Sequence, residues 1–199
     1  LAQGDLVVSE NSPTVKEILD FMMLWSDNLL ADRLAGLAAR AAGYSPNIKG
    51  IEIIFRTLLA QFEIDDSKLV VADASGLSKK NKITAKLMGE LLYKIRIDAR
   101  YALLYESLPI GGVSGTLQSR FTTTAPSAVG LVRAKTGTLN GTATLAGYVQ
   151  STDREYVFVT LADDIAKGNA ALNKARAAID RVLGRIAAPN IPAEISPAP

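Results

Sequence analysis

The segment Lys135-Thr136-Gly137-Thr138 combines residue types that can bind an anion. The lysine supplies an ammonium, the two threonines supply hydroxyl donors, and the glycine leaves the backbone open to close approach. This donor set suits a ligand carboxylate and the oxyanion that develops when a carbonyl is attacked. The other interpretation is a surface turn with a solvated lysine.

A second candidate is Ser26-Asp27-Asn28, which lies between two apolar-periodic segments. It offers a hydroxyl and a carboxamide at a helix junction. The alternative interpretation is a helix cap formed by Asp27 or Asn28. The sequence leaves both interpretations open.

Two further segments have the composition of loops. Residues 73–78, Asp-Ala-Ser-Gly-Leu-Ser, are predicted to form a tight loop that hydrogen-bonds its own backbone. Residues 108–117 are rich in glycine but lack the spacing and the lysine of a phosphate-binding loop. The acidic pairs Asp65-Asp66 and Asp163-Asp164 are interpreted as solvated strand ends rather than metal ligands. We therefore predict no metal and no cofactor.

Composition narrows the chemistry further. The 199 residues include no histidine and no cysteine, which excludes Ser-His-Asp and Cys-His catalysis, Cys/His zinc sites and disulfides within this chain. Nucleophilic chemistry would need Ser, Thr or Lys, with Lys or a carboxylate as base. A hydrophobic content of 48% fits one globular domain, and a net charge of +2 without a basic stripe gives no reason to expect nucleic acid as a partner.

The elements that must position these residues follow from hydrophobic periodicity. Helical spacing predicts helices over 11–26 (with Ser12 as cap), 29–41, 48–62, 84–98 (with Thr84 as cap) and 168–185. Alternation predicts strands over 68–72, 129–134, 142–150 and 155–162, with Lys135 after the end of one of them. The order predicts an α+β fold, a helical cluster plus an antiparallel sheet with a C-terminal helix packed on it. Residues 1–186 are expected to form this unit, and 187–199 a Pro/Ala-rich tail.

Four motifs in a fixed order carry a family resemblance. They are Ser-Asp-Asn at 26–28, Asp-x-Ser-Gly-Leu-Ser at 73–78, Leu-Pro-Ile-x-Gly-x-x-Gly-Thr-Leu at 108–117 and Lys-Thr-Gly-Thr-Leu at 135–139. Together they resemble the class C low-molecular-mass penicillin-binding proteins, the D-alanyl-D-alanine carboxypeptidases and endopeptidases that trim peptidoglycan. The resemblance runs from about Ser26 to Val149. It implies part of the serine β-lactamase/penicillin-binding transpeptidase fold.

The resemblance also implies roles for single residues. Ser26 would relay a proton to the leaving amine, Asn28 would hydrogen-bond the substrate amide, and Lys135 would hold and polarise Ser26. These three are the expected catalytic residues. The expected substrate-binding residues are Thr136, Gly137, Thr138, Asp73 and Ser75, with the two threonines on the terminal carboxylate.

One motif of the family is absent. The acylated serine lies in Ser-x-x-Lys, and no such tetrapeptide occurs here; Ser12 to Lys16 and Ser45 to Lys49 are each one residue too long. We therefore expect a nucleophile upstream of Leu1, so that this chain is a C-terminal piece, inactive alone, whose partner is the N-terminal piece. A degenerate, non-catalytic relative is the other possibility.

Three competing functions remain. A serine β-lactamase shares Ser-Asp-Asn and Lys-Thr-Gly but deacylates with a glutamate in Glu-x-x-Leu-Asn, which this sequence lacks. A non-catalytic module could bind peptidoglycan stems, and a structural α+β domain could carry the motifs by coincidence. The resemblance implies stem peptides as substrates, β-lactam antibiotics as covalent inhibitors and a location outside the cytoplasmic membrane.

Overall fold

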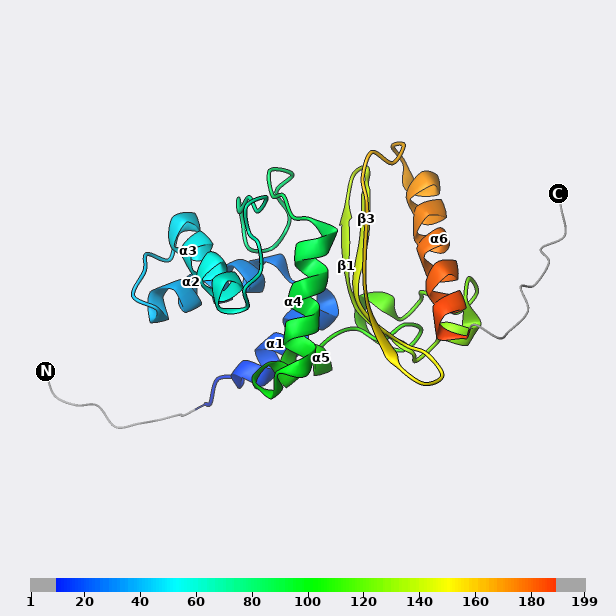
Figure 1. Ribbon diagram of the computed structural model, residues 1–199, viewed down its shortest axis with the longest axis horizontal. Coiled ribbons are helices and arrows are strands. Elements are labelled where there is room, and N and C mark those ends of the chain that lie inside the picture. Colours follow the sequence, from blue (N-terminus) through cyan, green and yellow to red (C-terminus); the bar gives the residue numbers. More distant parts are fainter. Residues whose placement is uncertain (1–9, 189–199) are drawn as a thin grey trace, which may run out of the picture.

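The computed structural model describes residues 10–188, and it has a helical part and a sheet part side by side (Figure 1). The helical part contains α1 (Val15–Trp25), α2 (Asn28–Ala41), α3 (Ile48–Gln61), α4 (Ala85–Ile97), η1 (Ala99–Tyr101) and α5 (Ala102–Glu106). The sheet part contains η2 (Gly115–Leu117), η3 (Pro126–Ala128), β1 (Val132–Leu139), β2 (Thr142–Gln150), β3 (Glu155–Ala162) and α6 (Asn169–Ala187). The predicted α+β class is confirmed.

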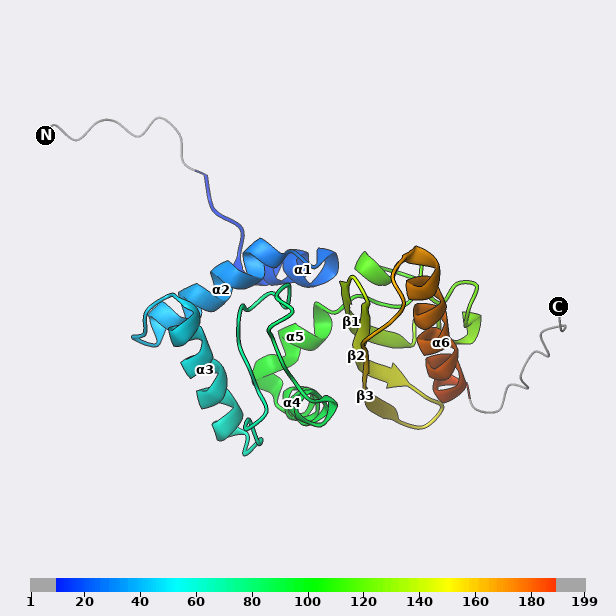
Figure 2. The same cartoon turned by 90° about the horizontal axis from the view of Figure 1, so that it is seen from above.

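The sheet is a three-stranded antiparallel meander in the order β1-β2-β3. Its face toward α6 is covered by apolar side chains, which form the main core; the buried members include Leu145, Val149, Ile179 and Leu183. Figure 2 shows α6 on one side of the sheet and the helical cluster on the other. The sheet is therefore buried on both faces, and β1 forms one of its two edges.

Helix α4 is attached to the helix-cluster side of the sheet by polar contacts as well as by packing. The hydroxyl of Tyr148 on β2 donates to the carbonyl oxygen of Leu92 at 2.7 Å. One turn further along α4, Arg96 pairs with Glu155 of β3 at 2.6 Å. These contacts fix the helical cluster relative to the sheet, which matters because the site described below lies between them.

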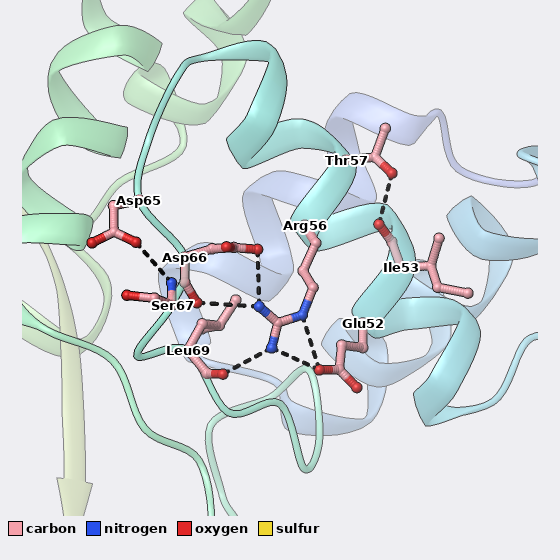
Figure 3. A network of polar contacts seen from close by, with 8 residues as sticks. All are labelled: Glu52, Ile53, Arg56, Thr57, Asp65, Asp66, Ser67 and Leu69. Carbon is pink, nitrogen blue, oxygen red and sulfur yellow. Dashed lines mark hydrogen bonds and ion pairs between the residues drawn. The ribbon is translucent and has the colours of Figure 1, made fainter.

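A second, smaller core joins α3 to α4, and a polar network extends it along the chain (Figure 3). The guanidinium of Arg56 bonds Glu52 at 2.8 Å, the carboxylate of Asp66 at 2.9 Å and the carbonyl oxygen of Leu69 at 3.0 Å. Arg56 thereby fixes residues 66–69, which lead into the loop at 73–81. Asp66 is engaged in this ion pair, and Asp65 accepts a hydrogen bond from the amide of Ser67 at 2.9 Å.

The structure corrects the predicted start of the first helix. Helix α1 begins at Val15 with Thr14 as its cap, rather than with Ser12. Thr14 and Glu17 form a capping box, in which each side chain bonds the other residue's backbone amide, and this reciprocal arrangement satisfies two free amides at once. The predicted cap of α4 is confirmed, since Thr84 accepts from the amide of Leu87 at 3.1 Å.

Two predicted strands are wrong in extent. Residues 68–72 contain only an isolated bridge between Val70 and Lys82, because no neighbouring strand extends the pairing. The strand expected at 129–134 is Val132–Leu139, since Gly130 turns the chain with a φ of +79° and pairing with β2 continues to Leu139. Lys135 to Thr138 therefore lie inside β1, not after it.

The C-terminal end also differs from the prediction. Helix α6 spans Asn169–Ala187 and so extends past the predicted helix end at residue 185, and residues 189–199 of the expected tail lie outside the described residues. In the part of the chain that the structure describes, no helix combines the length and the apolar character needed to cross a membrane.

Candidate active site

A cavity of about 530 Å³ lies along β1, between the helical cluster and the sheet. Its lining comes from the helix junction at 26–28, the loop at 75–77, the segment 116–120, the β1–β2 hairpin and Arg176 of α6. All four motifs singled out in the sequence contribute to it. None of the lining residues is acidic, so the cavity is a neutral to cationic site.

Ser26 and Asn28 enter the cavity because the chain turns sharply between α1 and α2. Ser26 ends α1 in the left-handed conformation, with φ 59° and ψ 49°. Asp27 then caps α2, accepting from the amide of Leu30 at 2.9 Å, and Asn28 is the first helical residue. The capping interpretation is thus correct for Asp27, while its two neighbours line the cavity.

Lys135 meets Ser26 across the cavity. Its Nζ donates to Ser26 Oγ at 2.6 Å and to the carbonyl oxygen of Thr136 at 3.0 Å. Burial lowers the pKa of Lys135 from 10.5 to about 8, because the ammonium loses solvating water and no carboxylate of residues 10–188 compensates for it. An ammonium has three donors, so its third N–H is left for a ligand.

The glycine-rich segment places the end of α1 on the sheet part. A Cβ on Gly115 would lie 2.4 Å from the carbonyl oxygen of Leu24, and its φ of +54° also favours glycine. The backbone just before Ser26 therefore rests directly on this segment. The next residue is Thr116, whose hydroxyl oxygen accepts a hydrogen bond of 3.0 Å from the hydroxyl of Thr136 on β1. This bond connects the glycine-rich segment to β1 at the wall of the cavity.

The Lys-Thr-Gly-Thr segment presents different groups on its two faces, because side chains alternate along a strand. Lys135 contacts the helical cluster through Ser26, whereas Thr138 contacts α6, where its Oγ1 accepts from Arg176 Nη2 at 3.0 Å. At Gly137 a Cβ would lie 2.3 Å from Thr144 Oγ1 of β2. The glycine is needed for this close side-chain approach across the hairpin.

The loop at 73–78 folds on the carboxylate of Asp73, as its sequence predicts. Asp73 accepts from the amides of Gly76 at 2.7 Å and Ser78 at 2.6 Å, and from Asn81 Nδ2 at 2.6 Å. These bonds commit the carboxylate to the loop itself, and Asp73 is not among the cavity-lining residues. The structure therefore does not bring Asp73 into the cavity as the expected substrate ligand.

Ser75, by contrast, does line the cavity, and α2 fixes its position. Asp32 accepts from the amides of Ala74 at 2.9 Å and Ser75 at 3.0 Å through the same oxygen, Oδ1. Asp32 follows Asn28 by four residues, so the two lie on the same face of α2. One helix face thus supplies both a cavity residue and the anchor of the loop opposite.

A second guanidinium lines the cavity but is neutralised locally. Arg120 bonds both carboxylate oxygens of Asp180, which is only 2% exposed, and Asp180 also accepts from Thr124 Oγ1 at 3.0 Å. This pair joins the segment after η2 to α6. The ion pair holds this wall of the cavity in place, and the carboxylate of Asp180 cancels the charge of the guanidinium.

Sequence reasoning did not identify several residues that build the site. These are Asp32, Thr116, Asp180 and Arg176. Helical spacing from Asn28 is a signal that could have indicated Asp32, and Thr116 lies within the glycine-rich motif. For the two residues of α6 no local signal exists, because only the packing of that helix brings them to the cavity.

Comparison with known proteins places this arrangement in a family. The sequence model of the D-Ala-D-Ala carboxypeptidase 3 (S13) family matches residues 2–186. The chain belongs to this family. Carboxypeptidase DacB of Mycolicibacterium smegmatis is 37% identical over 163 residues, 80% of this chain and 35% of the relative. The D-alanyl-D-alanine carboxypeptidase DacB of Haemophilus influenzae is 32% identical over 171 residues, 84% of this chain and 35% of the relative.

Solved structures agree with the family assignment. Penicillin binding protein 4 (dacB) of Haemophilus influenzae superposes with a TM-score of 0.75 at 30% identity, covering 84% of this chain and 38% of that chain. A predatory endopeptidase of Bdellovibrio bacteriovorus, solved with an immunity protein, has a TM-score of 0.64 at 21% identity and covers 87% of this chain and 43% of that one, which shows a shared fold. The chain spans about a third of the length of the curated S13 relatives it matches.

Proposed function

We propose that this chain builds the lysine and threonine side of the active site of a serine-type D-alanyl-D-alanine carboxypeptidase/endopeptidase of peptidoglycan maturation. The observation that carries the proposal is the 2.6 Å contact between Lys135 Nζ and Ser26 Oγ in a cavity without acidic groups. If the motifs were coincidental in a structural domain, there would be no reason for a half-buried ammonium to have a serine hydroxyl, rather than a carboxylate, as its side-chain partner. The names of the S13 relatives support the carboxypeptidase activity.

The nucleophile is proposed to come from an upstream segment that carries Ser-x-x-Lys. The motif is absent from this sequence, and the relatives are about three times as long as the part matched here. The cavity nevertheless holds Ser26, Asn28 and Lys135 together. An upstream segment that carries Ser-x-x-Lys would add the nucleophilic hydroxyl and the lysine base to a site that already holds these three side chains.

The chemistry then proceeds by acyl transfer. The lysine of the upstream Ser-x-x-Lys takes the proton of the nucleophilic hydroxyl as its oxygen bonds to the carbonyl carbon of the penultimate D-alanine. The tetrahedral intermediate then collapses by breaking the C–N bond to the terminal D-alanine. The proton taken from the nucleophile reaches the leaving nitrogen through the Ser26 hydroxyl, and Lys135 stabilises negative charge on this relay through its ammonium. Asn28 hydrogen-bonds the substrate amide. Water releases the acyl group in the second half of the reaction.

The terminal carboxylate of the substrate is proposed to bind at Thr136 and Thr138. The same group occurs in penicillins, and penicillin binding protein 4 of Haemophilus influenzae was solved in complex with a β-lactam, which supports β-lactam antibiotics as covalent inhibitors. Because the substrate is part of the cell wall, we propose a location outside the cytoplasmic membrane, either secreted or membrane-associated. Protease treatment of cells whose cytoplasmic membrane is left intact tests this, since a cytoplasmic protein would survive.

The direct test is mass spectrometry of the protein, together with its upstream segment, before and after a labelled penicillin. We expect one adduct on the serine of the upstream Ser-x-x-Lys, and a carboxypeptidase product from a D-Ala-D-Ala peptide. Lys135→Ala should abolish acylation. Lys174, an exposed lysine of α6, supplies the matched control, since Lys174→Ala removes the same charge from the same part of the protein.

The outcomes separate the competing functions. Absence of an adduct with the nucleophile present would leave a non-catalytic stem-binding protein. Rapid nitrocefin turnover would instead favour a β-lactamase. An adduct that forms at the wild-type rate in Lys135→Ala would remove Lys135 from the mechanism.

A further inference from the structure

The guanidinium of Arg176 belongs to the cavity wall, although the residue lies in none of the four motifs. Arg176 projects from α6 toward the far end of the Lys-Thr-Gly-Thr segment. Its Nη2 donates to Thr138 Oγ1 at 3.0 Å, and its Nη1 donates to Asn173 Oδ1 at 3.3 Å. Both partners are neutral, so these contacts orient the guanidinium without cancelling its charge.

The charge balance of the cavity sets Arg176 apart from Arg120. Arg120 is paired with the buried carboxylate of Asp180. For Arg176 the structure gives no carboxylate within ion-pair distance among residues 10–188, and no acidic residue lines the cavity. An oriented, unneutralised guanidinium in a cavity without acids is a site for an anionic group of a ligand.

The direction of the hydrogen bond to Thr138 adds a second donor. A guanidinium can only donate, so Thr138 Oγ1 is the acceptor in this contact. The hydroxyl proton of Thr138 is then free to be donated elsewhere. Arg176 and Thr138 together can offer an N–H and an O–H to one carboxylate, which is the two-point arrangement that carboxylates favour.

We propose that Arg176 binds the terminal carboxylate of the peptide substrate and makes the site selective for peptides whose C-terminal carboxylate is free and charged. This inference rests on the proposed peptidase function and adds to it a residue outside the family motifs. Thr136 and Thr138 supply hydrogen bonds to the carboxylate, and Arg176 supplies the countercharge. Lys135 is already committed to Ser26 on the opposite face of β1.

The test compares two substrates that differ only in charge, using the protein with its upstream segment. One is an N-acylated Lys-D-Ala-D-Ala peptide with a free carboxylate, and the other is the same peptide with a C-terminal carboxamide. Arg176→Gln should lower kcat/KM for the carboxylate peptide about 10- to 100-fold, the value of one charge-assisted hydrogen bond. Arg176→Gln should change kcat/KM for the carboxamide peptide less than about 3-fold, since that peptide has no negative charge for the guanidinium to bind.

Two further variants keep the result interpretable. Arg176→Lys retains a positive charge and should recover part of the preference for the carboxylate. Arg181 is an exposed arginine of the same helix and lies five residues further on, about 140° around the helix axis. Arg181→Gln should leave both substrates unaffected. Matching thermal unfolding midpoints for the three variants and the wild type would establish that the fold is intact.

The outcomes distinguish this inference from the proposed function. Equal losses on both peptides, or no loss on either, in a folded Arg176→Gln protein would overturn the role of Arg176 while the peptidase function stood. A wild-type protein that is neither acylated by penicillin nor active on the carboxylate peptide would overturn the proposed function, and the inference with it.

Discussion

The lowered pKa of Lys135 predicts how acylation depends on pH. Burial brings the pKa from 10.5 to about 8, and no carboxylate of residues 10–188 offsets the lost solvation. At 1.36 kcal/mol per pKa unit, the buried site disfavours the charged form by about 3 kcal/mol relative to water. The sign follows directly: a disfavoured ammonium releases its proton at a lower pH than an exposed lysine does.

The expected result is a loss of acylation rate on the alkaline side. With a pKa of about 8, Lys135 is about 90% protonated at pH 7 and about 10% protonated at pH 9. In the proposed mechanism the ammonium polarises Ser26, so the rate constant for acylation by penicillin should fall about tenfold over this interval, in proportion to the protonated fraction. A solvent-exposed lysine would remain charged throughout it.

The assay is single-turnover acylation by a fluorescent penicillin between pH 6 and 10, with the protein carrying its nucleophile. Lys135→Arg is the matched variant, because a guanidinium keeps its charge beyond pH 12. The variant should be acylated more slowly, since the longer and planar guanidinium cannot reproduce the 2.6 Å contact of the lysine Nζ with Ser26 Oγ. Its acylation rate should, however, show no decrease near pH 8.

A flat wild-type profile from pH 7 to 9 would refute the reasoning, because it would mean that Lys135 is either fully charged or not required to be charged. The same fall in Lys135→Arg would also refute it, and would assign the titration to another group, such as the lysine of the upstream motif. Only a fall that Lys135→Arg removes supports the proposed role.

Three further substitutions test the framework of the site. Asp180→Asn leaves the guanidinium of Arg120 without its buried partner and should lower the free energy of unfolding by about 3–5 kcal/mol in urea denaturation. Asp32→Ala removes the acceptor of two loop amides; it should cost about 1–2 kcal/mol by the same measurement and slow acylation by penicillin. Gly115→Ala places a Cβ 2.4 Å from the carbonyl oxygen of Leu24, so it should displace the end of α1. The rate of acylation by penicillin should therefore fall even under conditions in which the variant remains folded. Wild-type values in any of these would contradict the corresponding contact.

Local signals in the sequence were sufficient for most helices and for the order of elements. Thr84 caps α4 as predicted, and alternation predicts β2 and β3 with the bounds that the structure has, Thr142–Gln150 and Glu155–Ala162. The loop around Asp73 also follows its sequence, because an aspartate followed by a glycine three residues later can bond its own backbone. In each case the deciding interactions span only a few residues.

The misplaced β1 strand has a non-local cause. Lys-Thr-Gly-Thr has the composition of a turn, but its pairing with β2, in which Lys135 lies opposite Ala146 and Gly137 opposite Thr144, continues the ladder through it. The same reason explains why Arg176 was not predicted. Its contact with Thr138 spans 38 residues and depends on how α6 packs on the sheet, for which no short pattern in the sequence is diagnostic.

Ser26 shows how the backbone positions the proposed proton relay at a cost to stability. A left-handed conformation costs a residue with a Cβ about 1 kcal/mol, and a glycine would adopt it more easily. The turn between α1 and α2 directs the serine hydroxyl to Lys135, where it accepts a hydrogen bond from Nζ. The proposed relay requires a side chain that can also pass a proton on, which a glycine could not do. The strain is supported from outside, by Asp27 capping α2 and by Gly115 under Leu24. Two segments more than 80 residues apart in the sequence therefore hold the Ser26 hydroxyl at Lys135, in a backbone conformation that a serine disfavours.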